Sequence, residues 1–336
     1  MVRTCALLGI LLAAGGARGE SPSDLTRTAI EKGLRRIEQG AANYITHREC
    51  FSCHHQAMAL LCFFSARARG FEVDKAKFEK QVEFTLATFK PNHDEIQKGK
   101  SIPGGNTMAA YALFALQAAQ HPADDTTRAL IEYLLLRQKS DGSWPAVTSR
   151  PPTEGSAFTN AALTLRVFKT YGPGKENQEA KDLRERIDKA AEKGRDWLLE
   201  HLPTTMEDKV FRLRAFVAAG VDKKQIEAAR DTLIKEQKVE GSWAQLPDKP
   251  GDVYATGTTL MALRDAGVVP TDGAYKKAIQ YLLKTQNPDG SWLVETRSKP
   301  VQTFFDNGDP GGKSQFISFA ATGWAVLALL ETAPPR

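Results

Sequence analysis

The sequence predicts an all-α fold, an (α/α)6 toroid in which six helical hairpins close into a ring. The first observation is a pattern, Gln-x-x-x-Gly-x-Trp, that occurs three times with its glycines at positions 142, 241 and 290. The second is that polar and apolar helical segments alternate along the chain, and the third is that no segment shows the alternating pattern of a strand. A repeat unit of about 49 residues indicates an architecture in which neighbouring units bury one another's apolar faces.

The three copies of the pattern lie in residues 133–144, 232–243 and 281–292. In each copy a helix whose apolar residues recur at three- and four-residue spacing ends at Asp-Gly or Glu-Gly, because glycine tolerates the positive φ of a sharp turn. The Trp then has a large apolar face and one N–H to place. We expect the Gln to bond the backbone at the end of a neighbouring helix. A degenerate copy, residues 193–203, fills the gap between the first two.

Amphipathic helices are expected to start near Ser23, Asp74, Ala123, Lys175, Lys223 and Thr271. Each is followed by a helix of small and apolar residues, with expected starts at Ser52, Asn106, Phe158, Lys209, Asp252 and Phe319. With the apolar helices inside and the amphipathic ones outside, six pairs close into a ring. The inner wall is then expected to carry Met108, Tyr111, Phe114, Phe158, Phe211, Tyr254, Phe319 and Trp324. A cleft at its upper rim would suit an apolar small-molecule ligand.

Composition narrows the possible partners. The chain has 336 residues, of which 42% are hydrophobic and 25% charged, as expected for one large globular domain. The net charge of +5 is spread over 45 basic and 40 acidic residues without a basic stripe, so we expect no nucleic-acid partner. No segment after the N-terminus reaches about 18 consecutive apolar residues, so we expect no transmembrane segment. The sequence identifies no protein partner.

The N-terminus has the pattern of an export signal. Arg3 supplies a positive start, residues 5–14 form a short apolar run, and residues 17–19 place small residues before a cleavage site at Glu20. We therefore expect a signal peptide over residues 1–19, a single toroid domain over 20–336, and a secreted or periplasmic protein. The mature chain would keep Cys50, Cys53 and Cys62, an odd number in a compartment that permits disulfides.

The three Gln…Gly-x-Trp copies resemble the QW motifs of the terpenoid cyclase and protein prenyltransferase superfamily, which includes squalene–hopene cyclases. The resemblance implies the toroid and not an activity, because these motifs tie outer helices together. Squalene–hopene cyclases protonate an alkene with an Asp-x-Asp-Asp motif that opens an inner helix. Here Asp252 matches the first Asp, but Tyr254 and Ala255 stand where the proton donor and its neighbour should be. A tyrosine cannot protonate an isolated alkene, so Asp252 and Tyr254 are candidates only for a divergent isomerase or lyase.

Protein prenyltransferases belong to the same superfamily that the QW motifs resemble, and they hold zinc with Asp, Cys and His. Their Asp-x-Cys pair would also map near Asp252 and Tyr254, so the Cys is missing. The last inner helix, residues 316–330, contains no His. The sequence therefore does not predict this zinc site at this place.

The stretch ECFSCHHQAM, residues 49–58, opens the first inner helix and carries the other candidate chemistry. Cys50-x-x-Cys53-His54 has the spacing of c-type haem attachment, in which two thiols bind the vinyl groups and the His ligates iron. Export, which that assembly requires, is supplied by the signal. The possible sixth ligands are His47, His55, Met58, His93 and Met108.

Three other interpretations of this stretch stay open. A transition metal such as zinc or copper would suit the thiols and imidazoles of His47, Cys50, Cys53, His54 and His55. Cys53 and Gln56 also resemble the Cys-x-x-Gln-x-Met of complement-type thioester domains, another (α/α)6 family, although Cys50 could attack such a thioester. The last interpretation is a Cys50–Cys53 disulfide, or two buried thiols, in a toroid without chemistry that serves as an interaction surface. Cys62 is expected to pack as a small hydrophobe.

Overall fold

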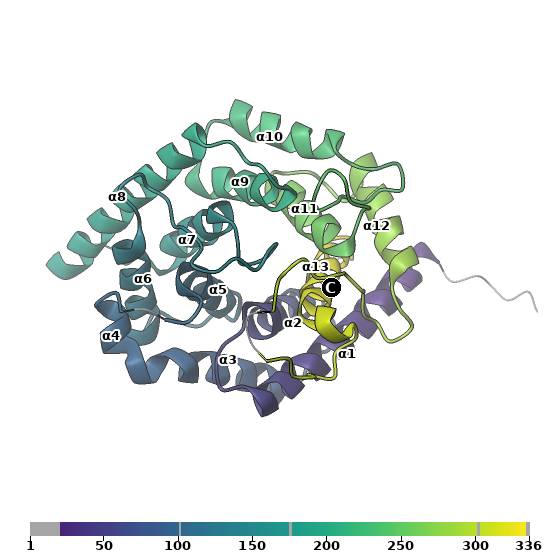
Figure 1. Cartoon of the computed structure of the whole chain (residues 1–336), viewed down its shortest axis with the longest axis horizontal. Helices are drawn as coiled ribbons and strands as arrows, with labels where there is room; N and C mark the ends of the chain where they lie inside the picture. Colours follow the sequence, from purple (N-terminus) through teal and green to yellow (C-terminus); the bar gives the residue numbers. More distant parts are fainter. Residues whose placement is uncertain (1–20, 101, 175–176, 301–302, 334–336) are drawn as a thin grey trace, which may run out of the picture.

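The computed structural model describes residues 21–100, 102–174, 177–300 and 303–333, and within them the chain forms two concentric rings of helices (Figure 1). The inner ring consists of η1 (Cys53–Ala57) with α2 (Met58–Ala68), α5 (Gly105–Ala118), α7 (Ala157–Tyr171), α9 (Met206–Ala219), α11 (Val253–Asp265) and α13 (Gln315–Leu330). The outer ring consists of α1 (Pro22–His47), α3 (Lys75–Phe89), α6 (Asp125–Arg137), α8 (Gln178–Glu200), α10 (Lys223–Lys235) and α12 (Gly273–Thr285). The predicted six-hairpin toroid is confirmed.

Short polar side chains set the helix starts. Asp74, Asp124, Asp222 and Asp272 are the N-caps of four outer helices, and each accepts a hydrogen bond from a backbone N–H of the first turn. Two inner helices begin earlier than expected, α9 at Met206 behind a Thr205 capping box and α13 at Gln315. The expected start near Lys175 lies outside the described residues, and α8 is described from Gln178. A short helix, α4 (His93–Gln97), was not predicted.

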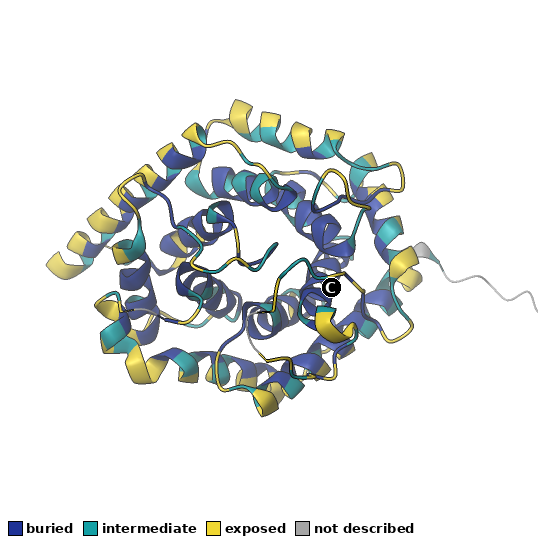
Figure 2. Ribbon diagram, viewed as in Figure 1, coloured by how far each residue is buried: buried dark blue, intermediate teal, exposed yellow. Residues whose placement is uncertain are grey.

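Burial follows the two rings. The inner helices are buried nearly all round, whereas the outer helices expose one face to solvent (Figure 2). By length and composition alone, the segment Gly312–Leu330 could cross a membrane, but 83% of its 18-residue apolar window is buried within the ring. Among the described residues it is therefore a core helix of the toroid, packed against α11 and α1.

The three QW turns clamp three of the outer helices, α6, α10 and α12, to the outer helix that follows each of them around the ring. In all three copies the Gln side-chain amide donates to the carbonyl oxygen of its own glycine and to a carbonyl of the following outer helix, and the Trp Nε1–H donates to its own helix. The amide of Gln138 reaches Ala190 in α8, at 2.8 Å, and that of Gln286 reaches Ala29 in α1, at 2.9 Å. The second of these bonds joins the last outer helix to the first, so it closes the ring.

The glycine of each clamp is required for close approach. Gly290 has φ +88°, and a Cβ there would overlap the carbonyl oxygen of Lys32 in α1. Gly142 and Gly241 meet the backbones of α8 and α12 in the same way. Any residue other than glycine is therefore disfavoured at these three positions for two reasons. The positive φ disfavours side chains, and a Cβ would overlap the backbone of the neighbouring helix.

Replacing Gly290 with alanine should destabilise the ring more than a matched change at Gly267. Gly267 has nearly the same φ, +87°, but no neighbour within 4 Å. Gly267→Ala should cost about 1–2 kcal/mol for the left-handed backbone alone. Gly290→Ala adds a backbone overlap and should cost about 1–3 kcal/mol more in the free energy of unfolding by urea. Equal losses for the two variants would contradict the clamp.

Candidate functional site

Cys53 and His54 lie at the mouth of the toroid, in the π turn η1 that opens the first inner helix. Ser52 caps the turn, and its Oγ accepts hydrogen bonds from the backbone N–H groups of His54 and His55. The backbone N–H of Ala57 bonds to Ser52 O, five residues back, which is the π pattern. The Cys53 side chain is buried, whereas that of His54 is 20% exposed.

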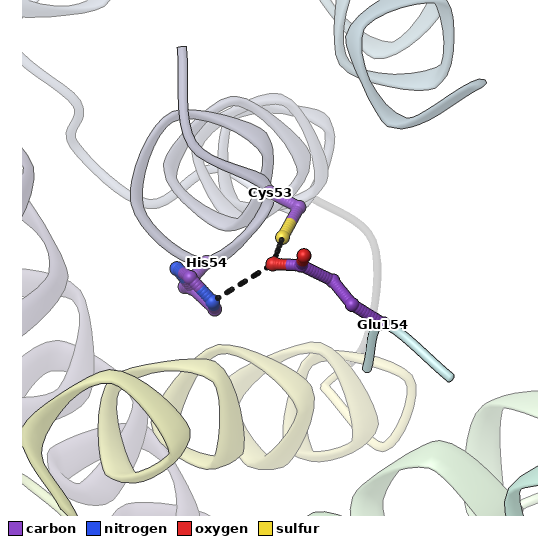
Figure 3. Close-up of side chains that lie close together, drawn as sticks. All are labelled: Cys53, His54 and Glu154. Atoms are coloured by element: carbon purple, nitrogen blue, oxygen red, sulfur yellow. Dashed lines mark hydrogen bonds and ion pairs between the residues drawn. The ribbon is translucent and has the colours of Figure 1, made fainter. Parts of the chain in front are cut away.

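A carboxyl group from a distant loop completes this cluster. Glu154, 2% exposed, lies in the connection between α6 and α7, which runs across the ring's opening. Its Oε1 accepts a hydrogen bond from the Cys53 thiol at 3.6 Å and lies 3.7 Å from His54 Nε2 (Figure 3). The three ligand-type atoms all lie within 4.8 Å of one another. We call Cys53, His54 and Glu154 the mouth cluster.

Neighbouring groups orient the members of the mouth cluster. His54 Nδ1 lies 2.8 Å from Ser52 Oγ, and the imidazole stacks on Phe316 with ring centres 5.5 Å apart. The other carboxyl oxygen of Glu154, Oε2, accepts a hydrogen bond from Thr148 at 3.0 Å and pairs with Arg150 at 2.7 Å. His54 Nε2 and Glu154 Oε1 are therefore the atoms left facing Cys53.

The surroundings keep the side chains of Cys53 and His54 neutral. Burial and the nearby Glu154 charge raise the pKa of the Cys53 thiol well above its usual value. Burial, with the nearby His55 and Arg150, lowers the pKa of His54 to about 3. At neutral pH, Cys53 is therefore a thiol and His54 is a neutral imidazole.

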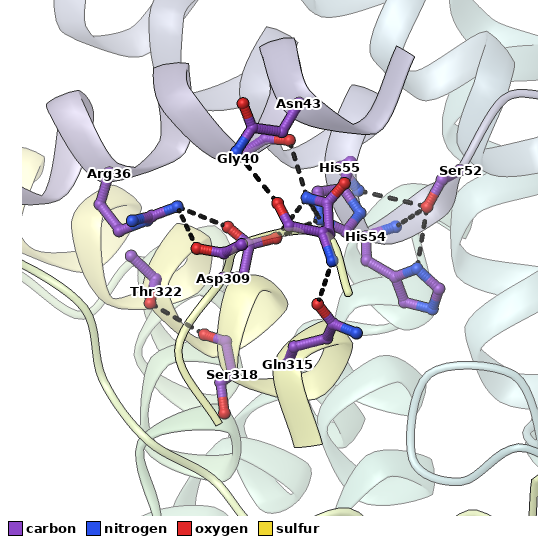
Figure 4. A network of polar contacts seen from close by, with 12 residues as sticks. Arg36, Gly40, Asn43, Ser52, His54, His55, Asp309, Gln315, Ser318 and Thr322 are labelled. Carbon is purple, nitrogen blue, oxygen red and sulfur yellow. Dashed lines mark hydrogen bonds and ion pairs between the residues drawn. The ribbon is translucent and has the colours of Figure 1, made fainter. Parts of the chain in front are cut away.

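His55 belongs to a different network, which joins η1 to the first outer helix, α1, and to the loop before the last inner helix, α13 (Figure 4). Its Nε2 lies 2.8 Å from Asp309 Oδ2, and Asp309 Oδ1 pairs with Arg36 of α1 at 2.9 Å. Burial acts to raise the pKa of Asp309, but His55, Asn307 and Arg36 together hold it below its usual value. Because His55 is fully buried and bonded there, it does not join the mouth cluster.

The remaining residues proposed for metal or haem lie apart from the mouth cluster. His47 is exposed at the end of α1, with its ring 5.6 Å from that of Phe305. Cys50 is an exposed free thiol whose Sγ lies 3.8 Å from Tyr44 Oη. Cys53 is also a free thiol, so the Cys50–Cys53 disulfide is not formed.

A c-type haem does not fit this arrangement. One of the two thiols is exposed, the other faces Glu154, and Phe316 covers a face of the His54 ring.

The thioester pair is not brought together either. The Gln56 side chain accepts from the Ser52 backbone at 3.1 Å and donates to Gln81 of α3 at 3.3 Å, whereas Cys53 bonds Glu154. Cys62 is buried, as expected, and lies 3.3 Å from the carbonyl oxygen of Gly323.

Below the mouth lies a second polar group, which involves the candidate Tyr254. Tyr254 Oη donates to Glu207 Oε1 at 3.3 Å and accepts from Thr153 at 3.2 Å, and Thr159 also donates to Glu207. Burial raises the pKa of Glu207 to about 8. The other candidate, Asp252, is the N-cap of α11 and accepts from the backbone N–H of Ala255 at 3.0 Å.

A buried arginine occupies the aromatic interior of the ring. The guanidinium carbon of Arg214 lies 5.4 Å from the ring centres of Phe211 and Trp324 and 5.9 Å from that of Phe114. Its Nε donates to Asp265 at 2.7 Å. The predicted aromatic wall is therefore present. The electron-rich faces of three of its rings, those of Phe114, Phe211 and Trp324, are directed at the guanidinium group of Arg214.

Comparison with known proteins agrees with the ring and its repeats. The squalene–hopene cyclase C-terminal domain family matches residues 184–334. The type II terpene cyclase MstE from Scytonema superposes with a TM-score of 0.53 over 93% of this chain and 99% of that one, at 13% identity. The chain is a terpenoid-cyclase-like toroid. A variant of MstE, with a TM-score of 0.51 and 14% identity over 92% of this chain and all of that one, was solved in complex with geranylgeranyl dihydroxybenzoate.

Two relatives match part of the toroid in sequence. The squalene–hopene cyclase of Zymomonas mobilis is 28% identical over 134 residues, and the (+)-kolavenyl diphosphate synthase of Herpetosiphon aurantiacus is 33% identical over 93 residues. These matches cover 40% and 28% of this chain and 19% and 17% of the relatives. The chain thus spans less than a fifth of the length of these curated relatives.

Glu154 is the site residue that sequence reasoning missed. It is separated from Cys53 by 101 positions, and no local pattern marks it. One signal was present: it is the sole acidic residue of the long connection between Trp144 and Ser156, directly after a QW turn.

The stability of the toroid should fall as pH rises, through Glu207. Its folded pKa of about 8 lies above the reference 4.5, so between these values the folded state binds more protons than the unfolded state. Stability is then lost with rising pH by up to about 1.4 kcal/mol per pH unit. Glu207→Gln should flatten this dependence, measured by urea unfolding between about pH 5 and pH 8. Parallel curves for the two proteins would refute the assignment.

Proposed function

We propose that this toroid binds a transition metal ion, with zinc the best fit, through the mouth cluster. The observation that supports the proposal is the convergence of a thiol, an imidazole nitrogen and a carboxyl oxygen from two distant segments into a buried site. Cysteine, histidine and carboxylate side chains are the residue types that hold zinc and related transition metals in proteins. The proposal keeps Cys53 and His54 from the expected metal ligands and adds Glu154. It leaves out His47, Cys50 and His55.

The donor set favours zinc over harder cations. Thiolate and imidazole select zinc and other first-row transition metals, whereas magnesium and calcium prefer oxygen ligands. Ligand atoms around tetrahedral zinc lie about 3.5 Å apart, since the metal–ligand bonds are about 2.0–2.3 Å long. The contacts of Glu154 Oε1 with Cys53 and His54, 3.6 and 3.7 Å, already match that spacing.

The arrangement resembles a catalytic zinc site more than a structural one. Three protein ligands would leave a fourth position for water or substrate, where zinc supplies Lewis-acid chemistry. The protein's part is to hold the ligands: Ser52 directs His54 Nε2 toward the cluster, and Thr148 with Arg150 fixes the Glu154 carboxylate. We propose that the toroid is an enzyme or a binding protein that works through this position.

Alkene protonation is not supported by the residues at the expected place. Asp252 caps a helix and Tyr254 is a phenol. Glu207 is the buried acid nearest to them, but burial makes it a weaker acid, whereas alkene protonation needs an unusually strong one. We therefore propose that the standard cyclase acid is missing.

An apolar, isoprenoid-like ligand is the second candidate function, favoured by the aromatic inner wall. Phe114, Phe211 and Trp324 face a common cation, so a ligand in that space would have to displace Arg214. Extraction of the purified protein followed by mass spectrometry would test it, with a stoichiometric co-purifying lipid as the supporting result. Protein free of lipid that also fails to bind an added isoprenoid alcohol would contradict it.

We further propose that the protein is exported to the periplasm or secreted. The support is the pattern of Arg3 and residues 5–19, which lie outside the described residues. A mature N-terminus at Glu20 on protein recovered from the exported fraction would agree with this proposal, and retention of the leader on cytosolic protein would contradict it.

Calorimetric titration with zinc under reducing conditions tests the metal site. The protein should bind one zinc ion per chain, and Cys53→Ser should weaken binding at least tenfold, since a thiolate ligand is lost. Cys50→Ser is the matched control and should bind like the parent, because Cys50 points at Tyr44 and not at the cluster. Equal weakening by both changes, or no binding by the parent protein, would rule out this site.

A further inference from the structure

The loop that carries Glu154 is fixed at its ends and lightly held along its length. At the start of the loop, Asn106 and Asn160 donate to the carbonyl oxygens of Pro145 and Trp144, and at its end Ser156 caps α7. Between these points, the backbone–backbone hydrogen bonds of residues 146–155 join only Arg150 and Glu154, and none reaches the backbone of the rest of the described chain. The loop is therefore a small hairpin that lies over the mouth without joining the helical framework.

Side chains at the tip of this hairpin hold it down. Glu154 contacts Cys53 and His54, Thr153 donates to Tyr254, and the carbonyl oxygen of Pro151 accepts from Ser298 at 2.9 Å. Thr153 and Glu154 are 6% and 2% exposed, whereas Val147, on the outer part of the loop, is 50% exposed. Four polar contacts, three of them made by the side chains of Thr153 and Glu154, thus hold the tip of the hairpin against the ring.

We propose that residues 146–155 form a cover over the toroid's mouth and that the metal ion locks the cover shut through Glu154. This inference rests on the proposed metal site. Cys53 and His54 sit on the rigid inner ring, whereas Glu154 sits on the cover, so one ion held by all three crosslinks them. Lifting the cover removes Thr153 from Tyr254 and gives access to Tyr254 and Glu207 beneath it.

Thermodynamic reciprocity makes this proposal quantitative. If the open state keeps Cys53 and His54 but loses Glu154, the metal favours closure by the ratio of its affinities for the closed and open states. Loss of a group that only hydrogen-bonds to a metal ligand typically weakens metal affinity by about 10–100-fold, so loss of a direct ligand should cost at least about tenfold. Saturating zinc should therefore lower the equilibrium population of the open cover by about the same factor by which Glu154→Gln weakens zinc binding.

Hydrogen–deuterium exchange of the full-length protein, read from peptides that cover residues 146–155, tests the proposal. Saturating zinc should slow exchange of these amides about tenfold or more relative to chelator-treated protein, while peptides from α8 stay unchanged. Glu154→Gln should abolish this slowing. Glu185→Gln, a change at an exposed carboxylate of α8, is the matched control and should keep it in full.

The outcomes separate this inference from the proposed function. If calorimetry shows one bound zinc per chain but exchange of the cover is unchanged, the lock is refuted and the metal site stands. If the parent protein binds no zinc, both are refuted. Thermal unfolding of Glu154→Gln should confirm a folded ring; if that variant is unfolded, Glu154→Asp, which shortens the carboxylate's reach, replaces it and should lose most of the slowing.

Discussion

The toroid depends on three glycines that let a turn lie directly against the backbone of the next outer helix. At Gly142, Gly241 and Gly290 the φ angle is left-handed and the space for a Cβ is already taken by a carbonyl group. The Gln amide and the Trp of each repeat then fix the turn by hydrogen bonds across and within the helices. Because the last clamp binds α12 to α1, the first inner helix is held beside the last one.

Ring closure assembles the mouth from segments that are far apart in the chain. The Arg36–Asp309–His55 network links α1, the loop before α13 and η1, and it fixes the face of η1 that carries His54. The α6–α7 connection then brings Glu154 from the opposite side. The interior offers less room for chemistry, since Arg214 lies among its aromatic rings and Asp252 caps a helix. Accordingly, the unusual side chains of this toroid gather at its rim.

The sequence predicted those features of the fold that are encoded locally. The QW turns, the Asp N-caps and the alternation of apolar and amphipathic helices each depend on residues within one or two helical turns, so the six hairpins could be placed to within a few residues. The start of α13 was missed because Ser314 and its neighbours provide no capping side chain.

The site was only half predictable, for physical reasons. Cys53 and His54 were singled out by their spacing, but neighbours in sequence proved to face different partners, since His55 is drawn to Asp309 and Gln56 to Gln81. Glu154 depends on tertiary structure, because it meets Cys53 only after the ring has closed. A motif of a few consecutive residues carries no information about a partner 101 positions away. The haem, thioester and multi-histidine interpretations all depended on such short-range spacing, so none of them included Glu154.

X-ray absorption at the zinc edge, on protein loaded with one zinc ion per chain, tests the central claim most directly. The account predicts one sulfur scatterer at about 2.3 Å together with nitrogen and oxygen scatterers at about 2.0–2.2 Å, from Cys53, His54 and Glu154. Loss of the sulfur shell in Cys53→Ser, but not in Cys50→Ser, would assign it. A shell with two sulfur atoms, or with none, would contradict the account.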